Sequence, residues 1–329
     1  MRCLVTGAAG FIGSHLCEYL LRHGHDVSGL DAMIPYYSPG IKERNLEDAK
    51  ADSRFRFHRL DLRYDPLDAA VADADVVFHL AGMPGLNQSW VDFDGYMTCN
   101  VQATQRLLEA MHRVGDARLV YASTSSVYGR QACGDESMPT RPISPYGVTK
   151  LAGEKLCLAY AETLGMHVAI LRYFSVYGPR QRPDMGYFNF IQALINDQPI
   201  TVYGDGQQVR GNTFVTDCVR ATALAVKATS GEVFNVGGGE TASVWDILNK
   251  LEMLTGRTAR IVRRPARPGD QRQTQAVTGK IASLLGWNPK TPLDEGLARQ
   301  LAWQEFELGD RYPMESLIGN SEPALAAVG

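Results

Sequence analysis

Short apolar runs of strand length alternate with segments of helical period through the first half of the chain. The apolar runs lie at residues 2–6, 26–31, 55–60, 75–80, 119–123 and 167–173, and the helical segments at 11–23, 95–113 and 146–164. Most of these runs are nearly continuous, which is typical of strands buried on both faces of a parallel sheet. The alternation therefore predicts an α/β fold with a doubly wound parallel sheet.

The pattern loosens after Tyr173, where a stretch rich in Pro, Arg and Gly at 178–186 leads into shorter elements. We expect a smaller α/β lobe there. The apolar run at 232–236 predicts a strand that returns to the first sheet. The first domain is therefore expected to comprise residues 1–173 plus about 211–240, and the second lobe about 174–210 plus 241–316. Residues 317–329 lack a period and are expected to form a tail.

Composition excludes several classes of protein. The chain has 329 residues, 45% of them hydrophobic and 21% charged, which is typical of a globular protein and not of a disordered or collagen-like chain. A net charge of -3 gives no broad field for nucleic acid or an anionic membrane. No apolar run approaches the ~20 residues of a membrane helix, and the start lacks the pattern of a signal peptide.

Six cysteines are scattered along the chain, with no C-x-x-C pair and no His-rich cluster spaced for a metal. We expect them to be reduced and mostly buried thiols of a cytoplasmic protein. No metal site is predicted.

A glycine-rich loop joins the first strand to the first helix. Gly7 permits a tight turn, Gly10 lets the backbone approach a pyrophosphate, and Gly13 allows the helix to pack closely on the sheet. The phosphates would lie at the helix N-terminus. Because the loop lies within a β-α-β unit, it predicts a dinucleotide site of the Rossmann-like kind.

Asp31 ends the second apolar run, where an acidic side chain can accept hydrogen bonds from the adenosine ribose hydroxyls. Ala32 and Met33 follow, so no adjacent arginine would hold a 2′-phosphate. This favours NAD over NADP.

Tyr146 and Lys150 are four residues apart at the start of a predicted helix, which Ser144 caps and Pro145 opens. Thr124 follows the buried run at 119–123, at the edge of the sheet where α/β proteins bind ligands. A free tyrosine has a pKa of ~10, so its use as a base near neutral pH requires that value to fall by ~3 units. A nearby ammonium and the positive nicotinamide of NAD can supply this together.

The G-x-x-G-x-x-G loop and the Y-x-x-x-K pair resemble those of extended short-chain dehydrogenases/reductases, in particular the NAD-dependent epimerase/dehydratase family, over roughly residues 2–301. The resemblance implies that Tyr146 exchanges the proton of a sugar hydroxyl, that Lys150 tunes it and holds the nicotinamide ribose, and that Thr124 bonds the same hydroxyl. It implies that NAD stays bound and is recycled. Asn100 corresponds to the structural Asn of the central helix. The implied cofactor contacts are Gly7, Gly10, Phe11, Ile12, Gly13, Asp31, Asp61, Leu62, Leu80, Ala81, Tyr146, Lys150 and Tyr173.

The residues after Thr124 bear on the reaction. The family's 4,6-dehydratases carry Asp and Glu there, and its UDP-glucuronate decarboxylases usually carry Glu at the position of Ser126, whereas this chain has Ser125 and Ser126. Without an acid and base for elimination, what remains is return of the hydride to the other face of the ketone, which is epimerisation at carbon 4. A dehydratase or decarboxylase is therefore disfavoured. A non-catalytic NAD sensor would be expected to lack Tyr146 or Lys150.

The segment from Arg182 to Met185 resembles the R-P-D-M segment of bacterial UDP-glucuronic acid 4-epimerases, which also carry Thr or Ser at the position of Ser175. A desolvated carboxylate needs several donors, and Thr124, Ser125, Ser126 and Ser175 can supply them, with charge from Arg182. Because a 4-keto-glucuronate is a β-keto acid, donors that fix its carboxylate near the ketone plane would slow the loss of carbon dioxide. The alternative is an epimerase of UDP-glucose and UDP-galactose, in which the hydroxyls bond a neutral hydroxymethyl group and Arg182 is solvated or pairs with Asp184.

The resemblance also implies contacts with the UDP group, made by Val202, Tyr203, Arg210, Arg267, Asp270 and, facing the diphosphate, Asn189. Two arginines that flank a pyrophosphate both neutralise and orient it. The chain departs from the family at Gly85-Leu86-Asn87, where Gly-Val-Arg is frequent, and at Arg210-Gly211-Asn212, where Arg-Asp-Phe is frequent. The family usually forms homodimers through the helices predicted here at 95–113 and 146–164.

Overall fold

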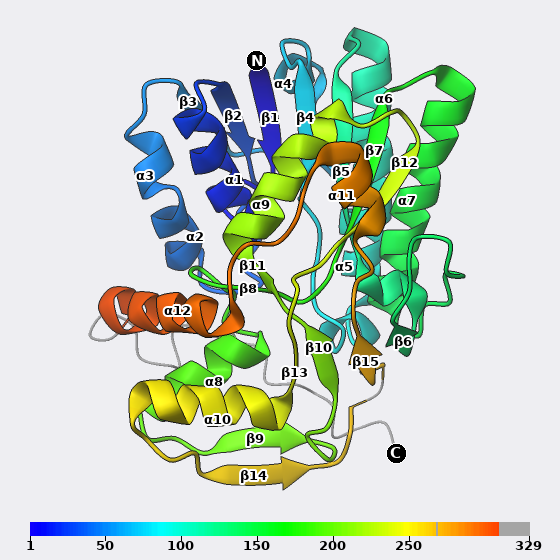
Figure 1. The fold of residues 1–329 in the computed structure, drawn as a ribbon. Coiled ribbons are helices and arrows are strands. Elements are labelled where there is room, and N and C mark those ends of the chain that lie inside the picture. The colour runs from blue at the N-terminus through cyan, green and yellow to red at the C-terminus, as the bar shows by residue number, and fades with distance from the viewer. Residues whose placement is uncertain (268, 309–329) are drawn as a thin grey trace.

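A computed structural model describes residues 1–267 and 269–308 and contains a seven-stranded parallel sheet (Figure 1). The strand order is β12-β7-β5-β4-β1-β2-β3, so the chain reverses its direction of travel across the sheet between β1 and β4. The strands are β1 (Arg2–Thr6), β2 (Asp26–Leu30), β3 (Phe55–His58), β4 (Val76–His79), β5 (Arg118–Thr124), β7 (Val168–Tyr173) and β12 (Glu232–Val236).

Alternate residues of each central strand enter separate cores on the two faces of the sheet. Cys3 and Val5 of β1 pack in one core and Leu4 in the other. Helices α1 and α9 cover the first face, and α6 and α7 cover the second (Figure 1). The helices of this part are α1 (Phe11–Arg22), α2 (Pro39–Asn45), α3 (Glu47–Lys50), α4 (Asp68–Val71), α5 (Phe93–Met97), α6 (Ala103–Val114), α7 (Pro145–Leu164), α9 (Val215–Leu224) and α11 (Gly279–Leu285).

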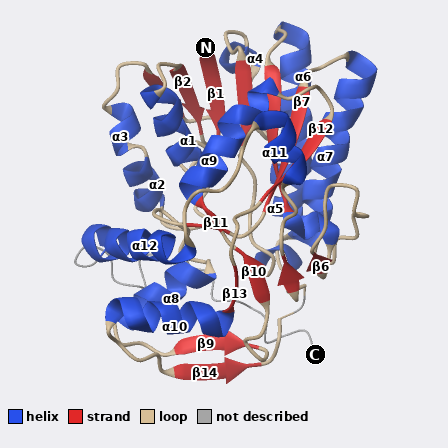
Figure 2. Ribbon diagram, viewed as in Figure 1, coloured by secondary structure: helices blue, strands red, loops and turns tan. Residues whose placement is uncertain are grey.

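A second lobe lies beyond the carboxyl ends of the parallel strands, as Figure 2 shows. Its helices are α8 (Gly186–Ile195), α10 (Val244–Thr255) and α12 (Leu293–Leu308), and its two-stranded parallel sheet pairs β9 (Ile200–Tyr203) with β14 (Ile261–Arg264). A four-stranded sheet runs between the lobes in the order β13-β10-β15-β6. Its strands are β13 (Thr241–Ser243), β10 (Val209–Gly211), β15 (Gln273–Thr274) and β6 (Gln131–Ala132), and β8 (Val176–Tyr177) pairs separately with β11 (Thr213–Phe214).

Three crossings of the chain between the lobes meet at Thr213. Its hydroxyl donates to the Phe174 carbonyl at 2.6 Å and accepts from the Gly238 amide at 2.9 Å, and its own amide donates to the Ser175 carbonyl. The crossing backbones are so close that a Cβ on Gly238 would lie 1.6 Å from the Asn212 carbonyl oxygen. Hydrogen bonds therefore hold the three backbone segments together at this junction, and there is no room for a side chain at position 238.

The α/β class, the parallel sheet and the return of residues 232–236 to it are confirmed. The single helix predicted at 95–113 is divided, because a π-helical turn, η2 (Thr98–Gln102), separates α5 from α6. Helices α2, α3 and α4 were not predicted, since seven or four residues are too few to show a helical period. The predicted tail at 317–329 and Pro268 lie outside the described residues.

Candidate active site

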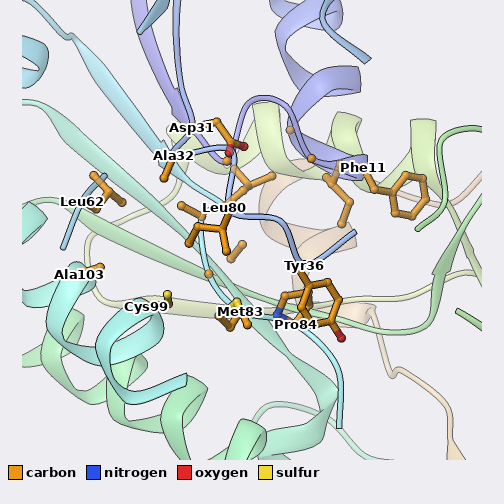
Figure 3. A pocket seen from close by; sticks show the side chains of 18 of the residues that line it. Phe11, Asp31, Ala32, Tyr36, Leu62, Leu80, Met83, Pro84, Cys99 and Ala103 are labelled. Atoms are coloured by element: carbon orange, nitrogen blue, oxygen red, sulfur yellow. The ribbon is translucent and has the colours of Figure 1, made fainter. Parts of the chain in front are cut away.

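A cavity opens where β1, β2, β4 and β5 end, at the point where the strand order reverses. It is lined by every residue that the family resemblance assigned to the cofactor, from Gly7 to Tyr173, together with Arg182. Figure 3 shows Asp31, Leu62, Leu80 and Phe11 around this space. Ligands of doubly wound sheets bind at such reversal points.

The glycine loop makes one wall of the cavity from bare backbone. Gly7 has a φ of +71°, and a Cβ there would lie 2.8 Å from the Ala81 amide nitrogen. A Cβ on Gly13 would lie 2.1 Å from the Gly7 carbonyl oxygen. Both positions therefore require glycine, and the backbone facing the cavity suits the close approach of a pyrophosphate.

Asp31 immediately follows β2 and is held by backbone donors at the cavity wall. Its carboxylate accepts from the Ala9 amide at 3.2 Å and the Met33 amide at 2.8 Å, and Lys42 Nζ lies 3.7 Å away. The structure thus adds a buried cation that the sequence analysis missed, because Lys42 belongs to α2. The carboxylate is fixed in orientation before any ribose is present.

Asp61 also lines the cavity, but its side chain is engaged by Arg63. The guanidinium donates to both carboxylate oxygens, at 3.0 Å from Nε to Oδ1 and 2.7 Å from Nη2 to Oδ2. This pairing lowers the pKa of Asp61. The site therefore presents a charge-neutral pair here, in which Arg63 is a further residue that the sequence analysis missed.

Tyr146 and Lys150 extend from the first turns of α7 into the cavity. The Ser144 hydroxyl accepts from the Gly147 amide at 3.1 Å and Pro145 opens the helix, so the start of α7 is fixed as the sequence predicted. Lys150 Nζ lies 4.2 Å from the centre of the Tyr121 ring, and burial lowers the pKa of Lys150 to about 8. Tyr96 packs edge-on against Tyr146, with ring centres 6.2 Å apart.

Burial raises the pKa of Tyr146 in the protein alone, while the Thr124 hydroxyl and the Arg182 charge act in the opposite direction. Base catalysis near neutral pH requires a fall of ~3 units in this pKa, so further positive charge beside the phenol would have to supply it.

Asn100 lies in the π-helical turn and ties three segments together. Its side-chain oxygen Oδ1 accepts from the backbone amide of Met83 at 2.7 Å. Its side-chain nitrogen Nδ2 donates to the backbone carbonyl of Met83 at 3.0 Å and to Thr149 Oγ1 at 3.1 Å. Thr149 is the neighbour of Lys150, so these bonds fix α7 against the loop after β4. This geometry matches the structural role that the resemblance implies.

The hydroxyl groups expected near the sugar lie at the end of β5. Thr124, Ser125 and Ser126 are all buried, and Thr124 Oγ1 donates to Ser126 Oγ at 3.2 Å. The 3₁₀ turn η3 (Ser125–Tyr128) carries the two serines. Ser175 lies on the β7–β8 connection with a φ of +28°, a conformation that L residues rarely adopt.

Arg182 lines the cavity and pairs with Asp184. The guanidinium donates to both carboxylate oxygens, at 2.9 and 3.0 Å, and Tyr36 Oη lies 3.3 Å from Asp184 Oδ2. This is the pairing that the neutral-sugar alternative allowed. Arg182 nevertheless faces the same space as Tyr146, and its charge acts on that phenol.

Four of the residues expected to hold UDP form two pairs. The Arg267 guanidinium stacks 3.4 Å from the centre of the Tyr203 ring, and Arg210 interacts electrostatically with Asp270. Burial raises the pKa of Asp270, an effect that Arg210 and then Arg267 oppose. The arrangement puts two cations and an aromatic face within one patch.

The other two expected UDP contacts lie outside these pairs. Val202 is buried in β9, where only its backbone could meet a ligand. The Asn189 side-chain amide donates to the carbonyl of Met185, the N-cap of α8, at 3.0 Å. The unusual Asn212 accepts from the Tyr187 hydroxyl and donates to the Arg210 carbonyl, which fixes Arg210's backbone without the family's Asp.

A buried ionic network lies behind the reacting groups and was not predicted. Glu154, one helical turn beyond Lys150, accepts from Arg172 Nε at 3.0 Å, from Arg172 Nη2 at 2.8 Å and from the Ser123 hydroxyl. Arg172 Nη1 donates to Tyr128 Oη at 2.8 Å. The four-residue spacing of Tyr146, Lys150 and Glu154 was the available signal, because it puts all three on one face of the helix.

All six cysteines are free thiols, and Cys133 alone is exposed. Within residues 1–267 and 269–308, no group of His, Cys, Asp and Glu side chains could hold a metal ion. Nor does this described part contain a helix with the length and apolar character needed to cross a bilayer.

A cavity at the reversal point of a doubly wound sheet, walled by the glycine loop and reached by a Tyr-x-x-x-Lys pair, defines a dinucleotide-dependent enzyme of the short-chain dehydrogenase/reductase type. The chain belongs to the NAD dependent epimerase/dehydratase family, whose model matches residues 3–237.

Three relatives illustrate the similarity. A Bacillus subtilis protein named uncharacterized UDP-glucose epimerase YtcB is 44% identical over 92% of this chain and 98% of its own. A UDP-glucuronate 4-epimerase of Thermodesulfobacterium geofontis is 35% identical over 92% of this chain and 95% of its own. The crystal structure of a UDP-glucuronic acid 4-epimerase from Bacillus cereus, in complex with UDP-glucuronic acid and NAD, is 42% identical with a TM-score of 0.90, covering 92% of this chain and 98% of that one.

Proposed function

We propose that this protein is a reversible UDP-glucuronic acid 4-epimerase that forms UDP-galacturonic acid through a 4-keto intermediate. The observation that carries the proposal is Thr124, whose hydroxyl bonds both Tyr146 and the buried Ser126, with Arg182 and Tyr146 lining one cavity. Ser125 is buried next to Ser126 at the end of β5. This set of hydroxyls offers donors for a carboxylate and no carboxylic acid or base for elimination. The UDP-glucuronic acid 4-epimerases among the similar proteins support the same substrate.

The bare glycine backbone and the fixed Asp31 carboxylate fit NAD, which when bound would take a hydride from carbon 4 and later return it to the opposite face. Tyr146 would take the proton of the 4-hydroxyl and give it back after the sugar has turned. Lys150 would hold the nicotinamide ribose and favour the phenolate, and Thr124 would bond the reacting oxygen. The rest of the cofactor would be enclosed by the remaining apolar and aromatic residues of the cavity, which are Phe11, Ile12, Leu62, Leu80, Ala81 and Tyr173.

The hydroxyls of Thr124, Ser125, Ser126 and Ser175 would bind the substrate carboxylate, with Arg182 providing charge. The bond at risk in the 4-keto intermediate is that between carbons 5 and 6. It breaks most readily when the carboxylate lies out of the ketone plane, because its electrons then flow into the carbonyl. Donors that hold the carboxylate near that plane would keep the acid intact until the hydride returns.

The test is to incubate the purified protein, without added NAD, with UDP-glucuronate and separately with UDP-glucose, and to identify the products by NMR. We expect UDP-galacturonate from the acid. Conversion of only the neutral sugar would replace this proposal with the UDP-glucose alternative, which allows the Arg182–Asp184 pair. A UDP-pentose as the main product would overturn the assignment of an epimerase.

Replacement of Arg182 by Ala should raise the KM for UDP-glucuronate by about 10- to 100-fold, because a hydrogen bond to a charged group contributes about 1.5–3 kcal/mol. The KM for a neutral UDP-sugar should change far less. Arg180→Ala is the matched control, since Arg180 lies two residues away and pairs with Glu18 and Asp48 instead. Equal effects of Arg182→Ala on both sugars in steady-state kinetics would contradict the role proposed for Arg182.

We further propose a division of labour between the lobes, in which residues 1–173 plus about 211–240 hold NAD. Residues of about 174–210 plus 241–316 would hold UDP, mainly through Tyr203, Arg210, Arg267 and Asp270. Val202 and Asn189 would make additional contacts.

We also propose that the protein is located in the cytoplasm. Its six cysteines are free thiols, five of them buried, which is typical of a protein in a reducing compartment.

The protein should also form a homodimer through the helices at 95–113 and 146–164, which are α5, α6 and α7 in the structure. Exposed apolar side chains gather on η1 (Gln88–Trp90), α5 and α7, which pack together; they are Trp90, Val91, Phe93, Met97 and Val148. Such a patch on two adjoining helices suits self-association about a two-fold axis.

Phe93→Glu should therefore convert the dimer to a monomer, as measured by light scattering coupled to size-exclusion chromatography. Leu284→Glu is the control, because Leu284 is comparably exposed on α11, away from this face. A wild-type protein that is monomeric at micromolar concentration would refute the dimer.

A further inference from the structure

Gln271 is a buried glutamine of the segment between the lobes whose side chain reaches the turn that carries the serine hydroxyls. Its amide Nε2 donates to the Gly129 carbonyl at 2.7 Å and to the Ser125 carbonyl at 3.2 Å. Ser125 begins the turn η3 and Gly129 directly follows it, so one amide group binds both ends of the turn. The residue is only 7% exposed, so water does not substitute easily for these bonds.

The backbone around Gln271 continues this attachment. The Arg272 amide donates to the Arg130 carbonyl at 2.9 Å, and the Gln275 amide donates to the Ala132 carbonyl at 2.7 Å. Between these bonds, β15 pairs in parallel with β6. Residues 271–275 therefore run beside residues 130–132, which follow the turn η3 that carries Ser125 and Ser126, called here the serine turn. These hydrogen bonds fix the position of residues 271–275 relative to the serine turn.

Gln271 is also the immediate neighbour of Asp270 and lies four residues from Arg267, on the loop proposed to hold UDP. At the other end of its side chain, Ser125 and Ser126 are the proposed donors to the substrate carboxylate. Gly129, where the turn ends, has a φ of +93° and a Cβ there would lie 2.2 Å from the Arg141 carbonyl oxygen, so this position requires glycine. Gln271 thus connects the loop proposed to hold UDP with the turn proposed to hold the carboxylate.

We propose that Gln271 is a positioning residue that holds the serine turn in the geometry needed to keep the carboxylate of the 4-keto intermediate from leaving. This inference rests on the proposed function. Without the two donors of Gln271, the turn would relax and the carboxylate would rotate out of the ketone plane. The bond between carbons 5 and 6 would then break, its electrons would form the enolate of the ketone, carbon dioxide would leave, and a proton would add to carbon 5.

The experiment compares wild type, Gln271→Met and Gln273→Met, each as the NAD-loaded enzyme with UDP-glucuronate. Met matches Gln in length but has no donor, and Gln273 is an exposed glutamine of the same segment. Products are quantified by NMR as the ratio of UDP-4-keto-pentose and UDP-pentose to UDP-galacturonate. We expect Gln271→Met to raise that ratio at least tenfold and Gln273→Met to leave it at the wild-type value.

A second measurement guards against a variant that folds poorly. Gln271→Glu keeps the shape but aims a carboxylate oxygen at the two carbonyls, so it should raise the same ratio, and melting curves establish which variants are folded. Amide hydrogen exchange of residues 125–129 should quicken in both variants. An unchanged product ratio in the folded variants would overturn the role of Gln271 alone, whereas absence of UDP-galacturonate from the wild type would overturn the proposed function instead.

Discussion

Tyr146→Phe should lower kcat by at least about 10³-fold, because the variant retains the ring but loses the group that exchanges the substrate proton. NAD should remain bound, since the remaining residues of the cavity wall are unchanged. Turnover is measured by NMR with UDP-glucuronate, and bound nucleotide is measured by chromatography after denaturation. Release of the cofactor from this variant would mean that the phenol has a different place from the one assigned here.

The matched control is Tyr96→Phe. Tyr96 is fully buried and packs edge-on against Tyr146, but its hydroxyl bonds the Pro84 and Gly85 carbonyls and not the reacting centre. Its loss should reduce kcat by less than about tenfold. A loss equal to that of Tyr146→Phe would show that packing around the ring, not proton transfer, limits the reaction.

Arg172→Met should lower the free energy of unfolding by about 3–5 kcal/mol, because it leaves the Glu154 carboxylate buried without its cation. Glu154 is 1% exposed and Arg172 6% exposed at the side chain. The loss is measured by urea denaturation of the NAD-loaded enzyme. Because the pair also clamps α7 against β5 and β7, activity should decline together with stability.

Two comparisons isolate the contribution of charge to the free energy of unfolding. The double variant Glu154→Gln with Arg172→Met removes both charges and should recover most of the loss. Arg113→Met breaks an exposed pair with Asp68, in which both side chains are about half exposed, and should cost less than about 1 kcal/mol. If the double variant is as unstable as Arg172→Met, shape and not charge dominates at this position.

The parts of the fold that the sequence could predict are those with a strong local signal. The central strands are near-continuous apolar runs because both of their faces are covered, and the glycine loop and the start of α7 carry their own turn and cap residues. The residues that the resemblance assigns to the cofactor line one cavity, because the family motifs lie on these same elements. Their contact with the cofactor remains a prediction.

What the sequence could not predict are polar partners that are distant along the chain. Lys42 meets Asp31 from a seven-residue helix, and Gln271 meets Ser125 across 146 residues. Arg182 was expected near a carboxylate, but nothing local distinguished the substrate's acid from Asp184. Such pairings depend on tertiary geometry, whereas hydrophobic periodicity reports only which face of an element is buried.

The junction at Thr213 limits how the enzyme can handle its substrate. The Thr213 hydroxyl bonds two neighbouring backbones, and Gly238 has no space for a methyl group, so this junction resists a hinge motion. We therefore expect the lobes to keep a constant separation through the catalytic cycle. A keto sugar that has to present its other face must then turn within a chamber of fixed size, anchored by its nucleotide, so the width of that chamber sets which sugars can be inverted.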